Sequence, residues 1–175
     1  MCYTFTMRYS YTTIYEKQAA FFRSRPTLIG VLLWASRILT AVFALAYFGL
    51  TAWLFCQKQY VSVICVLSAF ALCLLTVWVL RLAVDRKRPF EADGANISPL
   101  IPKAKTGRSF PSRHAACAFT VATLFVPFAW ALAAALSLLG MVICYSRFAL
   151  GWHYPSDLCG GAGLGVLCGL LILFA

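Results

Sequence analysis

The sequence predicts an all-α membrane protein, a polytopic bundle of about five transmembrane helices preceded by an N-terminal interfacial segment. Of its 175 residues, 62% are hydrophobic and 11% are charged. The mean hydropathy is +0.83, which is typical of an integral membrane protein and not of a soluble core. The apolar runs are close to the length that crosses a bilayer, and polar segments separate them. A chain of this length is expected to form one membrane domain over residues 1–175.

Residues 1–27 are rich in tyrosine and phenylalanine and carry several basic residues, which favours a segment lying in the membrane interface. They lack the short apolar core and small-residue cleavage site of a signal peptide. The first apolar run, Leu28–Cys56, would be roughly 43 Å long as one helix, longer than a ~30 Å hydrocarbon core. We therefore expect Arg37 near the interface and Ile38–Cys56 within the membrane.

The second apolar run, Val61–Leu80, has the length of one span. A loop rich in proline and glycine follows through Arg113, so no long helix is expected there. The third run, His114–Ser146, is interrupted by Pro127. It is either one long helix or a hairpin with two short arms of roughly 22–27 Å each, and hydropathy alone does not choose between them.

The last apolar run is Leu158–Ala175. Gly161, Gly165 and Gly169 recur in it at every fourth position. Small residues at this spacing let two membrane helices approach closely. We expect these glycines to form a packing face against another helix.

The charge is strongly unbalanced, with a formal net charge of +10, and the excess lies in residues 81–113. Basic residues at a membrane surface indicate anionic headgroups, a phosphate-bearing substrate or a cytoplasmic loop. Nucleic acid is a poor candidate partner because no soluble domain is available to bind it. The eight cysteines form no C-x-x-C pair, so they are expected to be small buried hydrophobes and not a disulfide framework or a zinc site.

Three polar clusters stand at the ends of the apolar runs, where charged side chains are costly and mark function. Arginine side chains match phosphate oxygens in pairs, and the free N–H groups at a helix start bind anions. We expect Pro111 in the first turn of such a helix. Together the clusters predict a cage for a phosphate dianion, which favours the hairpin because it brings them to one membrane side. The clusters are Arg81 with Arg88, Pro111-Ser112-Arg113-His114, and Ser146-Arg147 with His153 and Asp157.

The two histidines can divide the chemistry of phosphoryl transfer. His153 lies four residues before Asp157, a spacing at which the carboxylate can orient the ring, so we assign it as nucleophile. We assign His114 as the general acid, which then activates water against the phosphohistidine. The sequence shows no carboxylate cluster for magnesium, so no metal or other cofactor is expected.

These clusters resemble the motifs of the type 2 phosphatidic acid phosphatase (PAP2) superfamily, K-x6-R-P, P-S-G-H and S-R-x5-H-x3-D. The resemblance covers residues 81–157 with all internal spacings kept. It implies a metal-independent phosphatase acting on lipid phosphates or diphosphates, with the three motifs on one membrane face. It also implies the roles of the site residues: Arg81, Arg88, Ser112 and Arg147 on the phosphate, His114 as acid, His153 as nucleophile and Asp157 behind it.

Two residues depart from the family pattern. Arg81 replaces the lysine of the first motif. The positive charge is kept, but a planar guanidinium fork replaces a point charge. Arg113 replaces the glycine, so its side chain must point away or add a phosphate contact, which leaves substrate selectivity open. The family usually has six spans, and residues 1–27 could stand in for the first.

Several alternatives remain at this stage. The substrate could be a polyprenyl diphosphate or a phosphatidate-type lipid, and the acceptor could be a lipid instead of water. A non-catalytic lipid-phosphate carrier or scaffold would keep the arginines but need neither histidine. A vanadate-dependent haloperoxidase shares such a cage but is soluble. Only Lys58 lies in the loop opposite the motifs, which slightly favours a cytoplasmic site, although many relatives of the undecaprenyl-diphosphate phosphatase type face outward. Oligomeric state cannot be read from these patterns.

Overall fold

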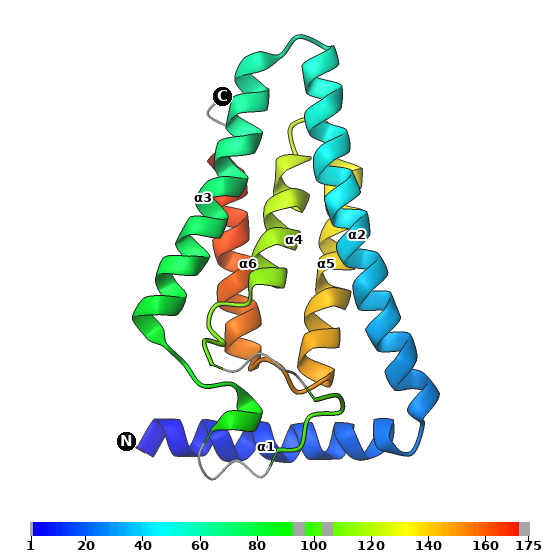
Figure 1. Cartoon of the computed structure of the whole chain (residues 1–175), viewed down its shortest axis with the longest axis vertical. Coiled ribbons are helices and arrows are strands. Elements are labelled where there is room, and N and C mark those ends of the chain that lie inside the picture. The colour runs from blue at the N-terminus through cyan, green and yellow to red at the C-terminus, as the bar shows by residue number, and fades with distance from the viewer. Residues whose placement is uncertain (1, 93–96, 103–106, 172–175) are drawn as a thin grey trace.

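The computed structural model describes residues 2–92, 97–102 and 107–171. Five helices run up and down as a bundle, and α1 lies across one end of it (Figure 1). The all-α prediction is confirmed for these residues. The elements are α1 (Cys2–Arg23), α2 (Pro26–Cys56), α3 (Tyr60–Val84), the 3-10 helix η1 (Pro89–Glu91), α4 (Arg113–Leu124), α5 (Trp130–Ala149) and α6 (Pro155–Gly169).

Within the described residues, three stretches are long and apolar enough to cross a membrane, Pro26–Cys56, Tyr60–Glu91 and Trp130–Ala149. The sequence predicted about five spans, but α4 has 12 residues and α6 has 15. Both are shorter than the ~20 residues that cross a hydrocarbon core. Neighbouring helices bury most of the α4 side chains, so its apolar character reflects a central position in the bundle.

Large apolar side chains also cover the outer surface of the long helices. Leu45 and Trp34 of α2 are 72% and 61% exposed, and Trp78 of α3 is 58% exposed. A soluble monomer rarely leaves so much contiguous apolar surface in water. The described residues therefore form a membrane protein whose outer helix faces meet lipid.

The third apolar run folds as the predicted hairpin. α4 ends at Leu124 and α5 begins at Trp130, with Pro127 in the turn between them. Proline has no N–H to continue a helix and disfavours helical backbone in the residue before it. The Ala129 N–H closes the turn by donating to the Phe125 carbonyl at 2.8 Å. The start of α4 and the end of α5 consequently lie at the same end of the bundle (Figure 1).

The predicted glycine face of α6 packs directly on the backbone of α4. A Cβ atom at Gly161 would lie 2.5 Å from the Ser112 carbonyl oxygen, and one at Gly165 would overlap the Ala116 carbonyl. Only hydrogen at these positions allows the two backbones to touch. This contact sets the first turn of α6 beside the first residues of α4.

This close contact predicts different effects for two glycine-to-alanine substitutions on α6. Gly165→Ala inserts a methyl group into the α4 backbone and should destabilise the fold by about 1–3 kcal/mol. Gly163 has no other atom within 4 Å of an added Cβ, so Gly163→Ala should be neutral or stabilising by up to ~1 kcal/mol. Thermal unfolding of the purified proteins in detergent measures the difference. Equal melting temperatures for the two variants would contradict this packing.

Candidate active site

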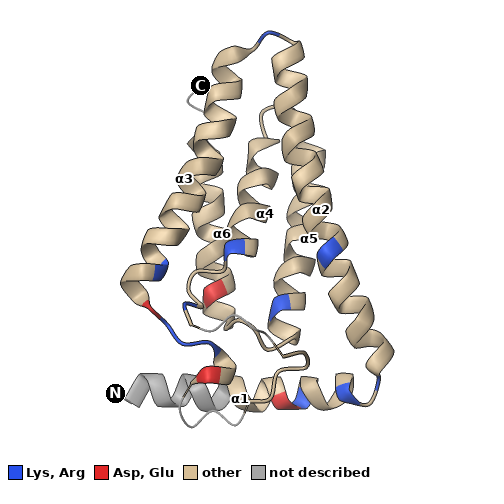
Figure 2. Ribbon diagram, viewed as in Figure 1, with Lys and Arg blue, Asp and Glu red and all other residues tan. Residues whose placement is uncertain are grey.

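The three polar clusters meet at the end of the bundle next to α1. The link after α3 carries Arg88, the start of α4 carries Ser112, and the loop between α5 and α6 carries His153. Most of the described lysine and arginine positions also lie in this half of the molecule (Figure 2). The hairpin thus brings to one end groups that are far apart in the sequence.

His153 and Asp157 form a buried pair. The imidazole is 1% exposed and the carboxylate is completely buried. His153 Nδ1 lies 3.5 Å from Asp157 Oδ2, and the same oxygen accepts the Tyr154 N–H at 3.0 Å. His153 precedes α6 and Asp157 lies in its first turn, so the helix start fixes the spacing of the two groups. A histidine held through Nδ1 presents Nε2 for chemistry.

Arg88 lies on the other side of the imidazole. Its Nη1 donates to the Trp152 carbonyl at 3.1 Å and lies 3.4 Å from His153 Nε2. A guanidinium can only donate, so this contact fits a ring whose Nε2 carries no proton. An unprotonated Nε2 beside a fixed positive charge is the arrangement that nucleophilic attack on an anionic phosphate needs.

Several buried donors in these clusters have no hydrogen-bond partner within the part of the chain that the structure describes. They are Ser112 Oγ, Arg88 Nε and Arg147 Nε. Ser112 is completely buried, and Arg147 is buried with its guanidinium 5.1 Å from the centre of the Trp152 ring. An unsatisfied buried donor costs about 1–3 kcal/mol, and more when it is charged. A tetrahedral oxyanion between the clusters would supply the missing acceptors.

The start of α4 adds backbone donors. The helix begins at Arg113 with Ser112 as its N-cap, so the prediction that Pro111 occupies the first turn is wrong. The Ser112 N–H donates to the Asp157 backbone carbonyl at 2.9 Å, which places the cap outside the helical pattern. The N–H groups of residues 113–115 lack partners within the helix and carry the positive end of its dipole.

Arg81, predicted to bind phosphate, holds the backbone in this structure. Its Nε and Nη2 donate to the Pro111 carbonyl at 3.1 and 2.9 Å. Two nitrogens of one guanidinium donate to the same carbonyl oxygen in this way. The single ammonium nitrogen of a lysine cannot reproduce this pair of hydrogen bonds. Arg81 thereby positions the residues that lead into α4 and does not face the His153–Asp157 pair directly.

Arg113 and His114 line an apolar cavity of about 330 Å³. Arg113 is exposed and His114 is half-buried. The cavity runs between α2, α3, α4 and α5, and apart from these two its lining is mostly apolar. The other lining residues are Thr40, Phe43, Ala44, Tyr47, Phe48, Phe70, Cys117, Ala118, Val121 and Ile143.

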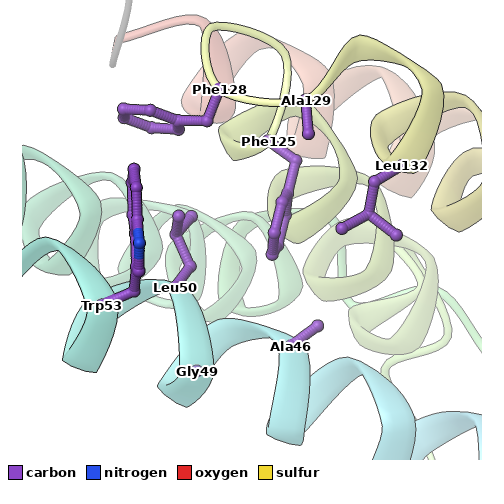
Figure 3. Close-up of a pocket in the computed structure, with 8 residues that line it drawn as sticks. All are labelled: Ala46, Gly49, Leu50, Trp53, Phe125, Phe128, Ala129 and Leu132. Carbon is purple, nitrogen blue, oxygen red and sulfur yellow. The ribbon is translucent and has the colours of Figure 1, made fainter.

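A second cavity of about 400 Å³ lies at the α4–α5 turn and contains none of the predicted site residues. Figure 3 shows Trp53 and Leu50 of α2 facing Phe125, Phe128 and Leu132 across it. This lining carries no charge and no titratable group, so we do not assign the chemistry to this cavity.

Sequence reasoning missed Arg86. Its Nη1 donates to Asp157 Oδ1 at 2.9 Å and to Ser156 Oγ at 2.8 Å. A signal was present, because Arg86 lies two residues before Arg88, and a buried acid such as Asp157 requires a charged partner.

α1 covers the loop that holds His153. The sequence did not predict this cover. The Tyr15 hydroxyl donates to the Ser98 carbonyl at 3.0 Å. The Tyr11 ring lies 5.0 Å from the Tyr154 ring, and burial raises the pKa of the Tyr11 phenol, so it stays neutral. Gly151, at φ +76°, leaves room for the Tyr15 hydroxyl above the loop.

Among the described residues, no three His, Cys, Asp or Glu side chains lie close enough together to hold a metal ion. The positive charge around the imidazole comes from arginine side chains.

Comparison with known proteins identifies the family. The model of the PAP2 superfamily matches residues 62–174. The chain belongs to the PAP2 superfamily. It is 31% identical over 147 residues to the Escherichia coli K12 protein named "Putative undecaprenyl-diphosphatase YbjG", covering 82% of this chain and 71% of that protein. The resemblance predicted from the motifs is confirmed, and with it the prediction of a PAP2 lipid phosphatase.

Two crystal structures share the fold. LpxE of Aquifex aeolicus is 28% identical with a TM-score of 0.70, over 91% of this PAP2 chain and 94% of that one. The transmembrane PAP2 type phosphatidylglycerolphosphate phosphatase of Bacillus subtilis is 20% identical with a TM-score of 0.58, over 95% and 94% of the two chains. The second likeness concerns the fold alone.

Proposed function

We propose that this PAP2 protein hydrolyses lipid phosphates or diphosphates without a metal, through a phosphohistidine at His153. The observation that supports this most directly is the buried imidazole with Asp157 Oδ2 at 3.5 Å from Nδ1 and Arg88 Nη1 at 3.4 Å from Nε2. A non-catalytic carrier would need the arginines but gains nothing from an oriented, buried histidine.

In the first step, His153 Nε2 attacks phosphorus while the bond from phosphorus to the lipid oxygen breaks. His114 gives its proton to the leaving oxygen. In the second step, water loses a proton to His114 and attacks the phosphohistidine, which releases inorganic phosphate and restores both imidazoles. Arg88 and Arg147 stabilise the charge on the equatorial oxygens, together with Ser112 and the N–H groups of the first turn of α4.

The cavity beside His114 supports a lipid as the leaving group. Its apolar walls suit an acyl or prenyl chain, and Arg113 and His114 lie where the headgroup would meet the chain. A terminal phosphate or diphosphate is the group that the arginines recognise. Polyprenyl diphosphate is the first substrate to test because of the similarity to YbjG, and a phosphatidate-type lipid is the second.

We further propose that the bundle crosses the membrane five times, with α1 in the interface on the side of the site. α4 and α6 would complete the two short crossings, as inner helices shielded by their neighbours. In the described residues, the loop between α2 and α3 carries Lys58 alone, whereas the opposite end carries most of the basic residues (Figure 2). This distribution favours a cytoplasmic site.

Phosphate release from lipid substrates should depend on His153. We expect His153→Ala to lower the rate by about 10³-fold or more, because the covalent step is lost. The assay measures inorganic phosphate from a panel of polyprenyl diphosphates and phosphatidates with purified protein in detergent. EDTA should leave the activity of the unaltered protein unchanged.

Binding of a fluorescent lipid phosphate to the same preparations is the control, because His153→Ala should still bind it. Activity abolished by EDTA would overturn the metal-free mechanism. Full phosphate release by His153→Ala would overturn the phosphohistidine mechanism, and binding of the lipid without any phosphate release by the unaltered protein would favour the carrier.

The cavity should determine the response to chain length. Ala44 lines it, so Ala44→Phe should raise KM several-fold for a long-chain lipid phosphate and much less for a short-chain one. Ala46 lies two residues along the same helix and lines the second cavity, so Ala46→Phe is the matched control. Equal changes in KM for both variants and both chain lengths would rule out this cavity as the chain site.

The five-crossing topology predicts that the C-terminus lies on the side opposite the motifs. A reporter fused there should therefore be periplasmic in a bacterial host if the site is cytoplasmic. Alkaline phosphatase and fluorescent protein fusions measure the side. A cytoplasmic C-terminus would instead place the site outside.

A further inference from the structure

We infer that Arg86, at one of the unspecified positions of the first motif, is a positioning residue that acts on the reaction through Asp157. It pairs with this carboxylate and holds it turned toward His153. The inference rests on the proposed function, since it assigns a source for the orientation of the proposed nucleophile.

The two oxygens of Asp157 have separate partners. Oδ1 accepts from Arg86 Nη1 at 2.9 Å. Oδ2 accepts the Tyr154 N–H at 3.0 Å and faces His153 Nδ1 at 3.5 Å. With Oδ1 held by Arg86, the carboxylate cannot rotate without breaking both bonds, so Oδ2 stays opposite the imidazole.

Arg86 also supplies the charge that the carboxylate needs. Asp157 is completely buried, and a buried carboxylate without a counter-charge takes up a proton. Among the described lysine and arginine side chains, that of Arg86 has a nitrogen within 4.0 Å of an Asp157 carboxylate oxygen. A protonated Asp157 would no longer stabilise a positive imidazole as the reaction proceeds.

Arg86 is itself fixed in place. Its backbone carbonyl accepts the Ser109 N–H at 2.8 Å. Its guanidinium lies 4.1 Å from the centre of the Tyr154 ring, and Nη1 also donates to Ser156 Oγ at 2.8 Å. Arg88, two residues later, reaches Nε2 on the other side of the imidazole. One short segment therefore places a positive charge at each end of the His–Asp pair.

Loss of the Arg86 charge should make the His153–Asp157 pair take up a proton at higher pH. Only the unprotonated imidazole attacks phosphorus, so the acidic limb of the pH profile moves upward. Other groups that act on Asp157 through their charge or polarity are Arg81 of α3, Arg88 of the link and Tyr11 of α1. His114 lies in the first turn of α4 and lines the apolar cavity. These groups remain in place when Arg86 is replaced, so the shift reports on Arg86.

The experiment compares Arg86→Gln, Arg86→Lys and Arg108→Gln in the phosphate-release assay with purified full-length protein. Arg86→Gln should lower kcat by about 10- to 100-fold with KM little changed, as for other groups that orient a functional histidine. Its acidic limb of kcat/KM should move to higher pH. Arg86→Lys should recover part of the lost kcat and of the pH profile, since one nitrogen makes both side-chain hydrogen bonds of Arg86, while the contact with the Tyr154 ring changes. Arg108 pairs with exposed Asp85 at 3.5 Å, so Arg108→Gln is the surface control.

The outcomes separate this inference from the proposed function. The inference is wrong if Arg86→Gln matches Arg108→Gln in kcat and pH profile. It is also wrong if kcat falls with an unmoved profile and no recovery in Arg86→Lys, because Arg86 would then support the fold alone. Melting temperature and size-exclusion profile check that each variant is folded. The proposed function fails separately, if His153→Ala releases phosphate at the full rate.

Discussion

The buried carboxylate of Asp157 is the constraint on which the site depends. Its backbone carbonyl accepts the N–H of the α4 cap, one side-chain oxygen faces His153, and the other holds Arg86. Three segments far apart in the sequence therefore converge on one residue. The glycine face of α6 makes this possible, because it lets the α6 backbone, and Asp157 with it, lie against the start of α4. The packing of α6 on α4 and the orientation of the His153 imidazole therefore depend on the same contact.

The arginines of the site divide into two groups by what they contact. Arg81 and Arg86 donate to protein acceptors, the Pro111 carbonyl and the Asp157 carboxylate. Arg88 donates to the Trp152 carbonyl through Nη1, but it and Arg147 are buried and each keeps an Nε without an acceptor among the described residues. The first group holds protein groups in place around the cage, and the second group supplies donors for an anion. This division explains how several positive charges can be tolerated at one end of an apolar bundle, since part of the charge is compensated before any ligand binds.

Much of the fold followed from the sequence because its signals are local. Pro127 marks the break between α4 and α5, and three glycines in register mark the packing face of α6. The length of α4 could not be predicted in this way, because an apolar run reads the same whether lipid or protein covers it. The placement of Pro111 failed for a related reason, since the helix start is set by a backbone bond to Asp157, more than forty residues away. The motif spacings indicated which polar groups would meet. They did not reveal Arg86, whose partner is chosen by tertiary structure, nor the cover that α1 provides.

The shortness of α4 has a consequence for how a lipid is presented. Its 12 residues rise about 18 Å, against a hydrocarbon layer of ~30 Å. In the proposed five-crossing topology, a cage at the N-terminus of so short a helix lies below the level of the surrounding headgroups unless the α4–α5 turn is buried or the bilayer thins around it. A phosphorylated lipid then has to sink, or the leaflet has to dip, before its headgroup meets the imidazole. Membrane thickness thereby becomes a variable of turnover, set by the host lipids and not by the protein alone.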